Sequence, residues 1–128
     1  MEDALPKTMS LERATEFAEA WNTHDPDFVA SFFATGGALY TSIGSGSYGD
    51  SYFGREEIRR GAKAFFDRFP DGRFEDIKVI VSGNIGTLEW NFTMSGADGK
   101  RYATAGCDLL EFEEELVLRK SAFRKVQG

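Results

Sequence analysis

The spacing of hydrophobic residues changes abruptly at Pro70-Asp71-Gly72, and this change constrains the fold more than any other feature of the sequence. Before it, apolar residues recur at intervals of three and four, which is the period of an amphipathic helix. After it, apolar and polar residues alternate, which is the period of a half-buried strand. Helices followed by a run of strands are typical of an α+β domain, so we predict helices packed on one curved antiparallel or mixed sheet.

The helical part divides into three segments. The first follows Ser10, a good N-cap residue, and is predicted to continue to about Asn22. The second restarts at Asp25-Pro26, since Asp accepts bonds from free backbone amides and Pro tolerates the first helical position. A third helix is predicted over residues 54–69. The buried face of the second helix is expected to contain Phe28, Val29, Phe32 and Phe33.

The second half of the chain is predicted to form a meander of strands. Apolar and polar side chains alternate along residues 87–94, so one face of that strand is apolar and the other is wet. Turn signals occur at residues 82–84 and 96–99. The last two strands are predicted over residues 100–112 and 116–126, joined by three glutamates.

Charge and composition exclude several classes of protein. The net charge of −6, with Lys and Arg scattered along the chain, argues against nucleic acid as a partner. No apolar run could span a bilayer, and the first residues lack an export signal, so we expect a cytoplasmic protein without membrane contact. Cys107 and His24 are the only residues of their types, too few for a disulfide or a recognisable zinc site. Any chemistry must therefore depend on carboxylates, hydroxyls, Lys and Arg, and we expect no metal and no cofactor.

Five segments carry a resemblance to a known family: residues 17–22 (FAEAWN), 25–33, 53–58 (FGREEI), 88–90 (LEW) and 106–112 (GCDLLEF). Their order and spacing resemble the SnoaL-like, ketosteroid-isomerase-like branch of the nuclear-transport-factor-2-like superfamily, over nearly the whole chain. The resemblance implies a cone-shaped fold, in which three amino-terminal helices pack on the curved sheet and enclose a pocket. It also implies that residues 1–128 form a single domain.

The resemblance leaves the reaction open, because isomerases, cyclases, hydrolases, dehydratases and non-catalytic binders share this scaffold. Ketosteroid isomerases place a Tyr on the first helix, an Asp on the strand after the second helix and an Asp on the penultimate strand. The matching positions here hold Phe17, Thr41 and Asp108. Phe17 cannot donate a hydrogen bond, and Thr41 cannot take a proton from carbon. The His and Asp pair of SnoaL-type cyclases is also incomplete, since His24 falls in a turn.

Asp108 is the candidate catalytic residue. Its strand places it on the same face as Leu110 and Phe112, where an acid is out of place. If this face lines the pocket with Trp90 and Phe92, desolvation raises the pKa of Asp108 and allows a neutral carboxyl group to donate a hydrogen bond to a substrate oxygen. Ketosteroid isomerase is a known example of this device. The alternative is that Asp108 only bonds a neighbouring hydroxyl or amide.

Arg119 is a second candidate, and its position depends on the register of the last hairpin. With residues 114–115 at the tip, Asp108 faces Ser121 and Leu110 faces Arg119. Arg119 would then share the inner face with Asp108 and could hold a carboxylate ligand. A slip of one residue would place Arg119 on the outside, where arginine is more common.

The remaining candidates are aromatic or carry a hydroxyl group. Residues 44–49 match the glycine spacing of a dinucleotide-binding loop, but no helix follows directly, so we interpret them as a flexible loop at the pocket mouth. A plain surface loop, and a core position for Tyr40, are the alternatives. Trp21 and the phenylalanines of residues 65–69 are interpreted as core packing. The residues predicted to contact the ligand are Tyr40, Thr41, Tyr48, Tyr52, Trp90, Phe92, Arg119 and Phe123.

The outer face of the same strands is too apolar to be stable in water. It is predicted to contain Ala103, Ala105, Cys107, Leu109, Leu116, Leu118 and Ala122. This pattern predicts a homodimer through the outer sheet face, as in many relatives of this fold. The alternative is that the carboxyl-terminal tail covers it.

Together these observations predict a protein that binds a hydrophobic small molecule with a carbonyl or hydroxyl group. Asp108 would act as acid and base in a cofactor-independent isomerase, cyclase or lyase. Two alternatives stay open: a non-catalytic ligand-binding or accessory protein, and a dimeric interaction module that uses the outer sheet face.

Overall fold

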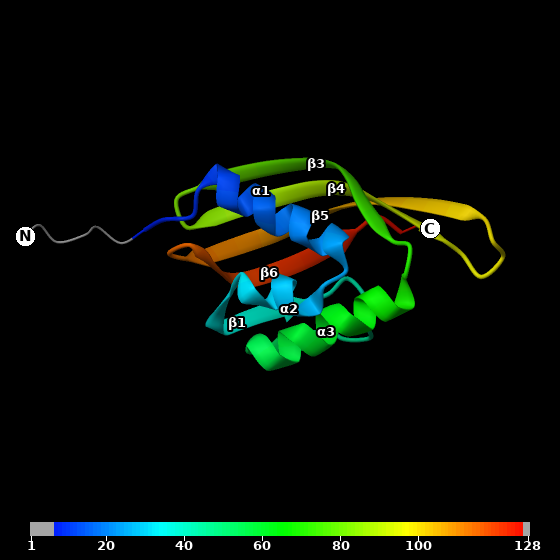
Figure 1. Cartoon of the computed structure of the whole chain (residues 1–128), viewed down its shortest axis with the longest axis horizontal. Coiled ribbons are helices and arrows are strands. Elements are labelled where there is room, and N and C mark those ends of the chain that lie inside the picture. Colours follow the sequence, from blue (N-terminus) through cyan, green and yellow to red (C-terminus); the bar gives the residue numbers. More distant parts are fainter. Residues whose placement is uncertain (1–6, 127–128) are drawn as a thin grey trace, which may run out of the picture.

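The fold was analysed in a computed structural model, which describes residues 7–126 of the 128-residue chain. The amino-terminal residues that bear on the prediction about an export signal lie outside this range. The helices precede the meander of four strands in the second half of the chain, as predicted, and two further strands lie between the second and third helices (Figure 1). The elements are α1 (Leu11–Ala20), the 3-10 helix η1 (Trp21–Thr23), α2 (Pro26–Ser31), β1 (Phe33–Tyr40), β2 (Ser51–Phe53), α3 (Arg55–Arg68), β3 (Arg73–Ser82), β4 (Ile85–Ser95), β5 (Arg101–Glu113) and β6 (Leu116–Arg124).

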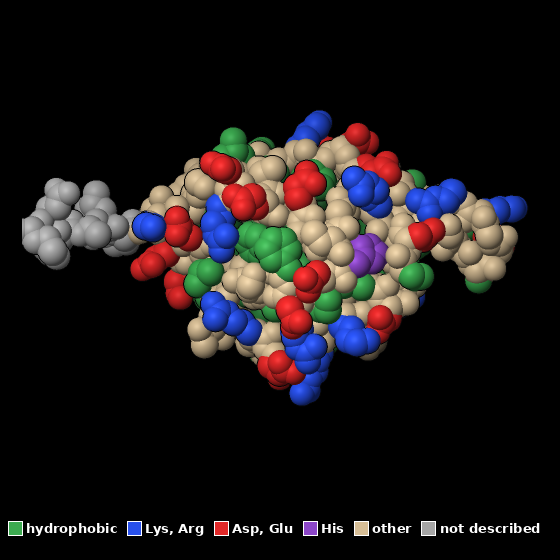
Figure 2. Space-filling view, in the orientation of Figure 1, with side chains coloured by type: hydrophobic (Ala, Val, Ile, Leu, Met, Phe, Trp, Pro, Cys, Tyr) green, Lys and Arg blue, Asp and Glu red, His purple; other side chains and the backbone are tan. Residues whose placement is uncertain are grey.

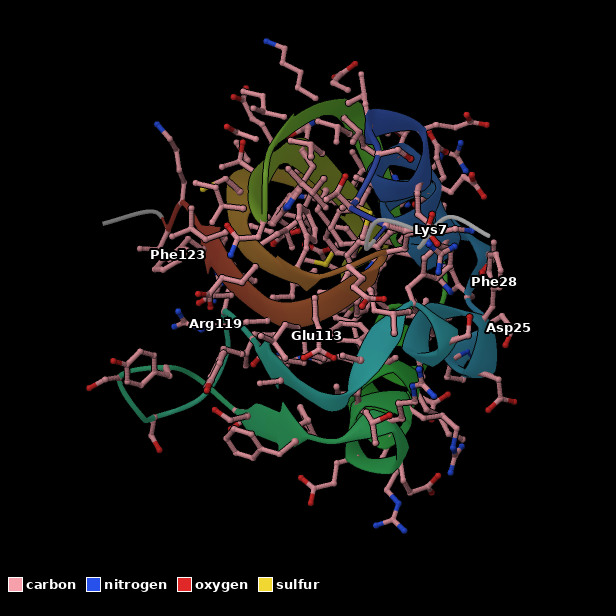
Figure 3. The ribbon with its side chains drawn as sticks, turned by 90° about the vertical axis from the view of Figure 1, so that its left-hand side faces the viewer. Lys7, Asp25, Phe28, Glu113, Arg119 and Phe123 are labelled. Atoms are coloured by element: carbon pink, nitrogen blue, oxygen red, sulfur yellow. The ribbon has the colours of Figure 1, made fainter. Side chains whose placement is uncertain are left out.

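The six strands form one mixed sheet in the order β2-β1-β6-β5-β4-β3. β1 runs parallel to β6, and all other neighbours are antiparallel. The sheet curves around the side chains of the core without closing into a barrel, and the helices lie on its concave side (Figure 3). The predicted α+β fold, with three helices on a curved mixed sheet, is confirmed. Its curvature leaves room between the sheet and α3 for a cavity.

The predicted helix starts are confirmed, and the ends differ by a few residues. The Ser10 side chain accepts a hydrogen bond from the backbone of Arg13 at 3.0 Å, and Asp25 caps α2 in the same way. α1 ends at Ala20 and is followed by η1, one 3-10 turn. Phe33 begins β1, which corrects its assignment to the second helix, and Phe28 is half-exposed. None of the helices within residues 7–126 is long and apolar enough to cross a membrane.

Asn22 fixes the turn after α1 against the sheet. Its side-chain amide donates to the carbonyl of Phe74 at 2.9 Å, and its side-chain oxygen accepts from the Phe74 amide at 2.8 Å. Asn22 therefore bonds to β3 as a strand neighbour would. This contact sets the position of the adjacent Trp21, whose ring is buried on the concave side of the sheet.

The β5–β6 hairpin contains a bulge that corrects the predicted register. Glu113 pairs with Leu116, as predicted, but Glu111 pairs with Arg119, so Leu118 is an extra residue on β6. From the bulge onward every residue of β6 changes face relative to the prediction. The actual pairs on the inner face are Asp108 with Ala122 and Leu110 with Lys120.

Candidate functional site

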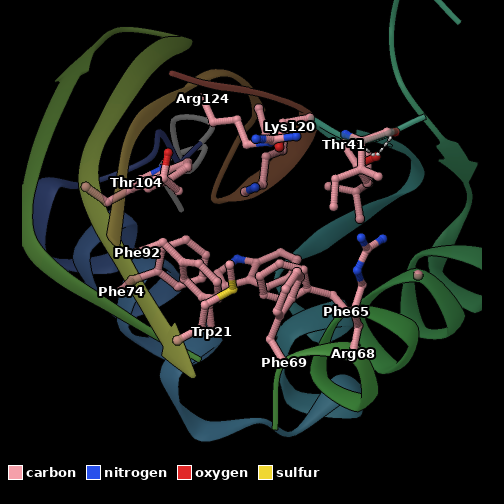
Figure 4. A pocket seen from close by; sticks show the side chains of 17 residues that line it. Trp21, Thr41, Phe65, Arg68, Phe69, Phe74, Phe92, Thr104, Lys120 and Arg124 are labelled. Atoms are coloured by element: carbon pink, nitrogen blue, oxygen red, sulfur yellow. Dashed lines mark hydrogen bonds between the residues drawn. The ribbon is translucent and has the colours of Figure 1, made fainter. Parts of the chain in front are cut away.

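A cavity of about 280 Å³ lies between α3, η1, the loop after β1, and strands β4, β5 and β6 (Figure 4). Phe74 and Trp90 pack edge to face with ring centroids 5.1 Å apart, and Phe65 lies 5.3 Å from Phe92. Rings in such contact form a rigid, flat-sided apolar wall. The structure thus corrects the interpretation of Trp21, Phe65 and Phe69 as packing residues only. The aromatic lining consists of Trp21, Phe65, Phe69, Phe74, Trp90 and Phe92.

The polar lining of the cavity is small and contains no acid. Three hydroxyl residues and three basic residues contribute to it, and no carboxylate or imidazole among residues 7–126 does. The Thr41 and Thr104 hydroxyls already donate to backbone carbonyls, at 2.9 Å each. The polar lining residues are Thr41, Ser42, Thr104, Arg68, Lys120 and Arg124.

Lys120 and Asp108 form a buried ion pair beside the cavity. Lys120 Nζ lies 3.4 Å from Asp108 Oδ1, and only 7% of Lys120 and 2% of Asp108 are exposed. Lys120 also lies 4.7 Å from the centroid of the Trp21 ring, in a cation–π contact. The bulge in β6 creates this arrangement, because it turns Lys120 inward toward β5. Lys120 lines the cavity, whereas Asp108 lies behind it.

The surroundings of Asp108 favour its neutral form. Burial raises the pKa of Asp108, while the Lys120 ammonium and, to a lesser extent, the Trp90 indole act to lower it. Oδ1 of Asp108 and the indole nitrogens of Trp21 and Trp90 have no hydrogen-bond partner within the described part of the chain. These groups meet at a void of about 10 Å³, which is close to the size of one water molecule.

Gly106 makes room for the ring of Trp90. It is paired directly with Trp90 across β4 and β5. A Cβ atom at this position would collide with the Trp90 ring and with the carbonyl oxygen of Phe123. The glycine therefore lets the indole lie flat against β5, beside the buried acid.

Four of the predicted site residues lie at the cavity or directly behind it. Thr41, Trp90 and Phe92 line the cavity, and Asp108 borders the small void that adjoins it through Lys120. Lys120, the basic partner of Asp108, was missed by the sequence analysis. An acid on an apolar strand face indicates that a basic residue of the neighbouring strand lies beside it. Whether that residue is Arg119 or Lys120 depends on the bulge in β6.

The other predicted ligand contacts lie outside the cavity lining. Arg119 is on the outer side of the sheet, 3.6 Å from Glu111, which corrects its predicted inner position (Figure 3). Phe123, 52% exposed, also points away from the cavity, because the bulge reverses its face. Tyr40 stacks against Arg119 on the outside, with 4.9 Å between its ring centroid and Cζ.

The two tyrosines of the loop region are corrected as well. Tyr48 is exposed and packs on Tyr40, with ring centroids 5.6 Å apart. Tyr52 belongs to β2 and covers Gly61 of α3, so it supports the helix instead of facing the cavity. Residues 44–49 form a loop that is not followed directly by a helix, which agrees with the rejection of a dinucleotide site.

Phe17 and His24, the residues at which ketosteroid isomerase and cyclase chemistry is incomplete, have structural roles. Phe17 is fully buried among aromatic rings of the core. His24 stacks on Phe66 and donates from Nε2 to the carbonyl of Gly72 at 2.7 Å, as a structural residue would. Within residues 7–126 no three His, Cys, Asp or Glu side chains are grouped so that they could hold a metal ion.

Solved structures with the same fold belong to several kinds of protein. One is described as a putative SnoaL-like polyketide cyclase from Jannaschia sp. CCS1, 15% identical, with a TM-score of 0.75 over 98% of this chain and 91% of that chain. Another is a putative polyketide cyclase from Xanthomonas campestris pv. campestris, 20% identical, with a TM-score of 0.70 over 88% and 90%. A hypothetical protein from Catenulispora acidiphila DSM 44928 is described as having a ketosteroid isomerase-like fold, in complex with trimethylamine. It is 22% identical, with a TM-score of 0.70 over 90% and 86%.

These identities establish a shared fold and leave the reaction open. A search of curated proteins found no significant match. The model of the SnoaL-like domain matches residues 14–120, which include every element from the middle of α1 to Lys120 on β6. The chain therefore belongs to the SnoaL-like domain family.

Proposed function

We propose that this protein binds a hydrophobic small molecule with a carbonyl or hydroxyl oxygen and transfers a proton on it, as a cofactor-independent isomerase, cyclase or lyase. The observation that carries the proposal is the buried Lys120–Asp108 pair at an otherwise aromatic cavity. A polar pair costs free energy when it is removed from water, so its place beside a cavity favours a role with a ligand. The volume of about 280 Å³ suits a small molecule.

Asp108 would act through Lys120. Burial raises the pKa of the Asp108 carboxyl, so this group can hold a proton behind Lys120. Lys120, which lines the cavity 3.4 Å from Asp108, would relay this proton: Asp108 gives it up through Lys120 when one atom of the ligand is protonated, and takes one back when another atom of the ligand loses its proton. Ser42, which lies in the lining, would donate its hydroxyl proton in a hydrogen bond to the ligand oxygen.

Deuterium exchange tests this function without knowledge of the natural substrate. The probe is 4-butylacetophenone, a flat hydrophobic ketone with exchangeable protons next to its carbonyl. In D2O, NMR should show that the protein accelerates loss of these protons. Lys120→Met and Asp108→Asn should abolish the acceleration, and Arg119→Met, which removes the outer cation, should retain it. Binding without acceleration in the wild-type protein would contradict the catalytic part of the proposal.

A non-catalytic binding or accessory protein is the second candidate. The lining favours it in one respect: within residues 7–126 it has no carboxylate or imidazole that could act as a second proton-transfer group. Calorimetry with the same ketone distinguishes the candidates. A binder keeps its affinity and shows no exchange, whereas an enzyme loses exchange in Asp108→Asn and keeps its affinity within about threefold.

We also propose that two copies associate through the outer face of β3, β4, β5 and β6. Leu109 and Phe123 are each about half exposed on neighbouring strands of this face. An apolar surface of this kind is more stable when it is covered. Light scattering should give the mass of a dimer for the wild-type protein and of a monomer for Leu109→Glu. An unchanged mass would contradict this interface.

The bulge corrects one residue of the predicted outer face. It turns Ala122 inward, where Ala122 pairs with Asp108 and lines the cavity.

A further inference from the structure

The charges around the cavity differ from those of the protein as a whole. The chain has a net charge of −6, and acidic and basic side chains alternate over the helical face of the molecule (Figure 2). The described lining of the cavity, in contrast, contains three basic side chains and no acidic one. A cavity lined by positive side chains attracts a ligand of negative charge, even in an acidic protein.

The three basic residues have different partners. Lys120 is balanced by Asp108, 3.4 Å away. Arg68 and Arg124 lie within 4.0 Å of no carboxylate in residues 7–126. Several other arginines of the molecule do pair with an acid, among them Arg101, whose Nη1 lies 2.7 Å from Asp71. The two arginines at the cavity are therefore available to an anion.

Arg68 and Arg124 approach the cavity from opposite sides. Arg68 is the last residue of α3, and Arg124 is the last residue of β6. In Figure 4 they reach toward the cavity from the helix and from the sheet, with the aromatic rings below Arg124 and beside Arg68. Both residues are exposed, whereas Lys120 is buried, so the guanidinium groups form the outer part of the site and the ion pair the inner part. Arg68 Cζ lies 5.3 Å from the centroid of the Phe69 ring, which supports its side chain.

We propose that the ligand is a hydrophobic carboxylate, with its anionic group bound by Arg68 and Arg124 at the mouth and its apolar body held by the aromatic wall. This inference rests on the proposed function, and it adds the chemical class of the ligand. Guanidinium groups suit a carboxylate because their planar N–H donors match its two oxygens. The oxygen on which proton transfer occurs then lies at the other end of the ligand, next to Lys120.

A pair of matched probes tests this assignment. 4-Butylbenzoate and 4-butylbenzamide have nearly the same shape, and only the benzoate is charged at pH 7. Calorimetry on the full chain should show the benzoate binding about tenfold more tightly, since bonds to charged groups are stronger than neutral ones. The double variant Arg68→Gln/Arg124→Gln should bind both probes equally. Arg73→Gln, which removes an exposed arginine of β3 outside the lining, is the control and should keep the preference.

Each outcome has one meaning. If the amide binds to the wild-type protein as tightly as the acid, the ligand is not selected as an anion, and the proposed function is unaffected. If the double variant keeps the preference, the assignment to Arg68 and Arg124 is wrong. If neither probe nor 4-butylacetophenone binds, the cavity does not accept an apolar ring, and the proposed function fails as well. Because both arginines are exposed, circular dichroism of the variants should match that of the wild-type protein.

Discussion

Two consecutive residues of β6, Arg119 and Lys120, make the same kinds of contact on opposite faces of the sheet. Arg119 lies 3.6 Å from Glu111 and 4.9 Å from the Tyr40 ring. Lys120 lies 3.4 Å from Asp108 and 4.7 Å from the Trp21 ring. Geometry alone therefore does not distinguish the two. The difference is burial, since the outer pair is partly exposed to water and the inner pair is almost completely enclosed.

Burial changes what each pair can do. Water screens the outer pair, so it contributes little to stability. In the inner pair both side chains have lost their hydration, so removing one partner is costly. The same kinds of contact are thus a surface detail on one face and a candidate functional site on the other.

The largest effect should come from breaking the inner pair. Lys120→Met removes the cation beside the buried Asp108 carboxyl, so that the ionised form of this carboxyl has no partner, and we expect it to lower the free energy of unfolding by up to about 3–5 kcal/mol at pH 7. Arg119→Met, the matched change on the outer face, should cost less than about 1 kcal/mol. Urea denaturation measures both values. Equal losses would show that the two pairs do not differ in burial, and the comparison would fail.

A smaller effect should follow from filling the space beside Trp90. Gly106→Ala places a methyl group against the indole and a backbone carbonyl, and overpacking of this kind costs about 1–3 kcal/mol. Gly36→Ala is the control, because a Cβ atom at Gly36 meets nothing within 4 Å. Thermal unfolding of the two variants should differ accordingly. A neutral Gly106→Ala would mean that the inner face can rearrange, and that Trp90 is not held rigidly.

The pH dependence of stability should also distinguish the faces. Because the pKa of Asp108 is raised in the folded protein, the native state keeps a proton that the unfolded state loses above about pH 4. Stability therefore falls as pH rises from there to the folded pKa, by at most about 1.4 kcal/mol per pH unit. Asp108→Asn removes this contribution, so its free energy of unfolding relative to wild type should rise through that interval. Glu111→Gln, which changes the outer pair, is the control. If the free energy of unfolding of both variants, relative to wild type, changed with pH in the same way, the raised pKa of Asp108 would be contradicted.

The sequence predicted the three helices and the later meander of strands because the hydrophobic period changes at Pro70; the period did not predict β1 and β2, which lie between α2 and α3. It also placed Asp108, Leu110 and Phe112 on one buried face, since alternation along β5 is regular. It failed where one extra residue changes the register. The bulge at Leu118 has no signal in the hydrophobic pattern, and it exchanged the positions of Arg119 and Lys120.

The cavity wall was only partly predictable for a different reason. Trp90 and Phe92 follow from strand alternation, but Trp21 and Phe65 lie on helices whose apolar stripe serves both the core and the cavity. Periodicity identifies the buried face of a helix and not the part of it that faces empty space. The cellular location and the dimer stay predictions.

A carbon-13 NMR titration of the aspartate carboxyl groups tests the central claim most directly, with Asp108→Asn used to assign the signal. We predict that the Asp108 carboxyl titrates above the ordinary aspartate value of about 3.9, because it is buried beside the cavity. Addition of 4-butylbenzoate should shift this signal, since Lys120 connects the cavity to the acid. A carboxyl that titrates with the exposed aspartates and does not respond to the probe would contradict the account.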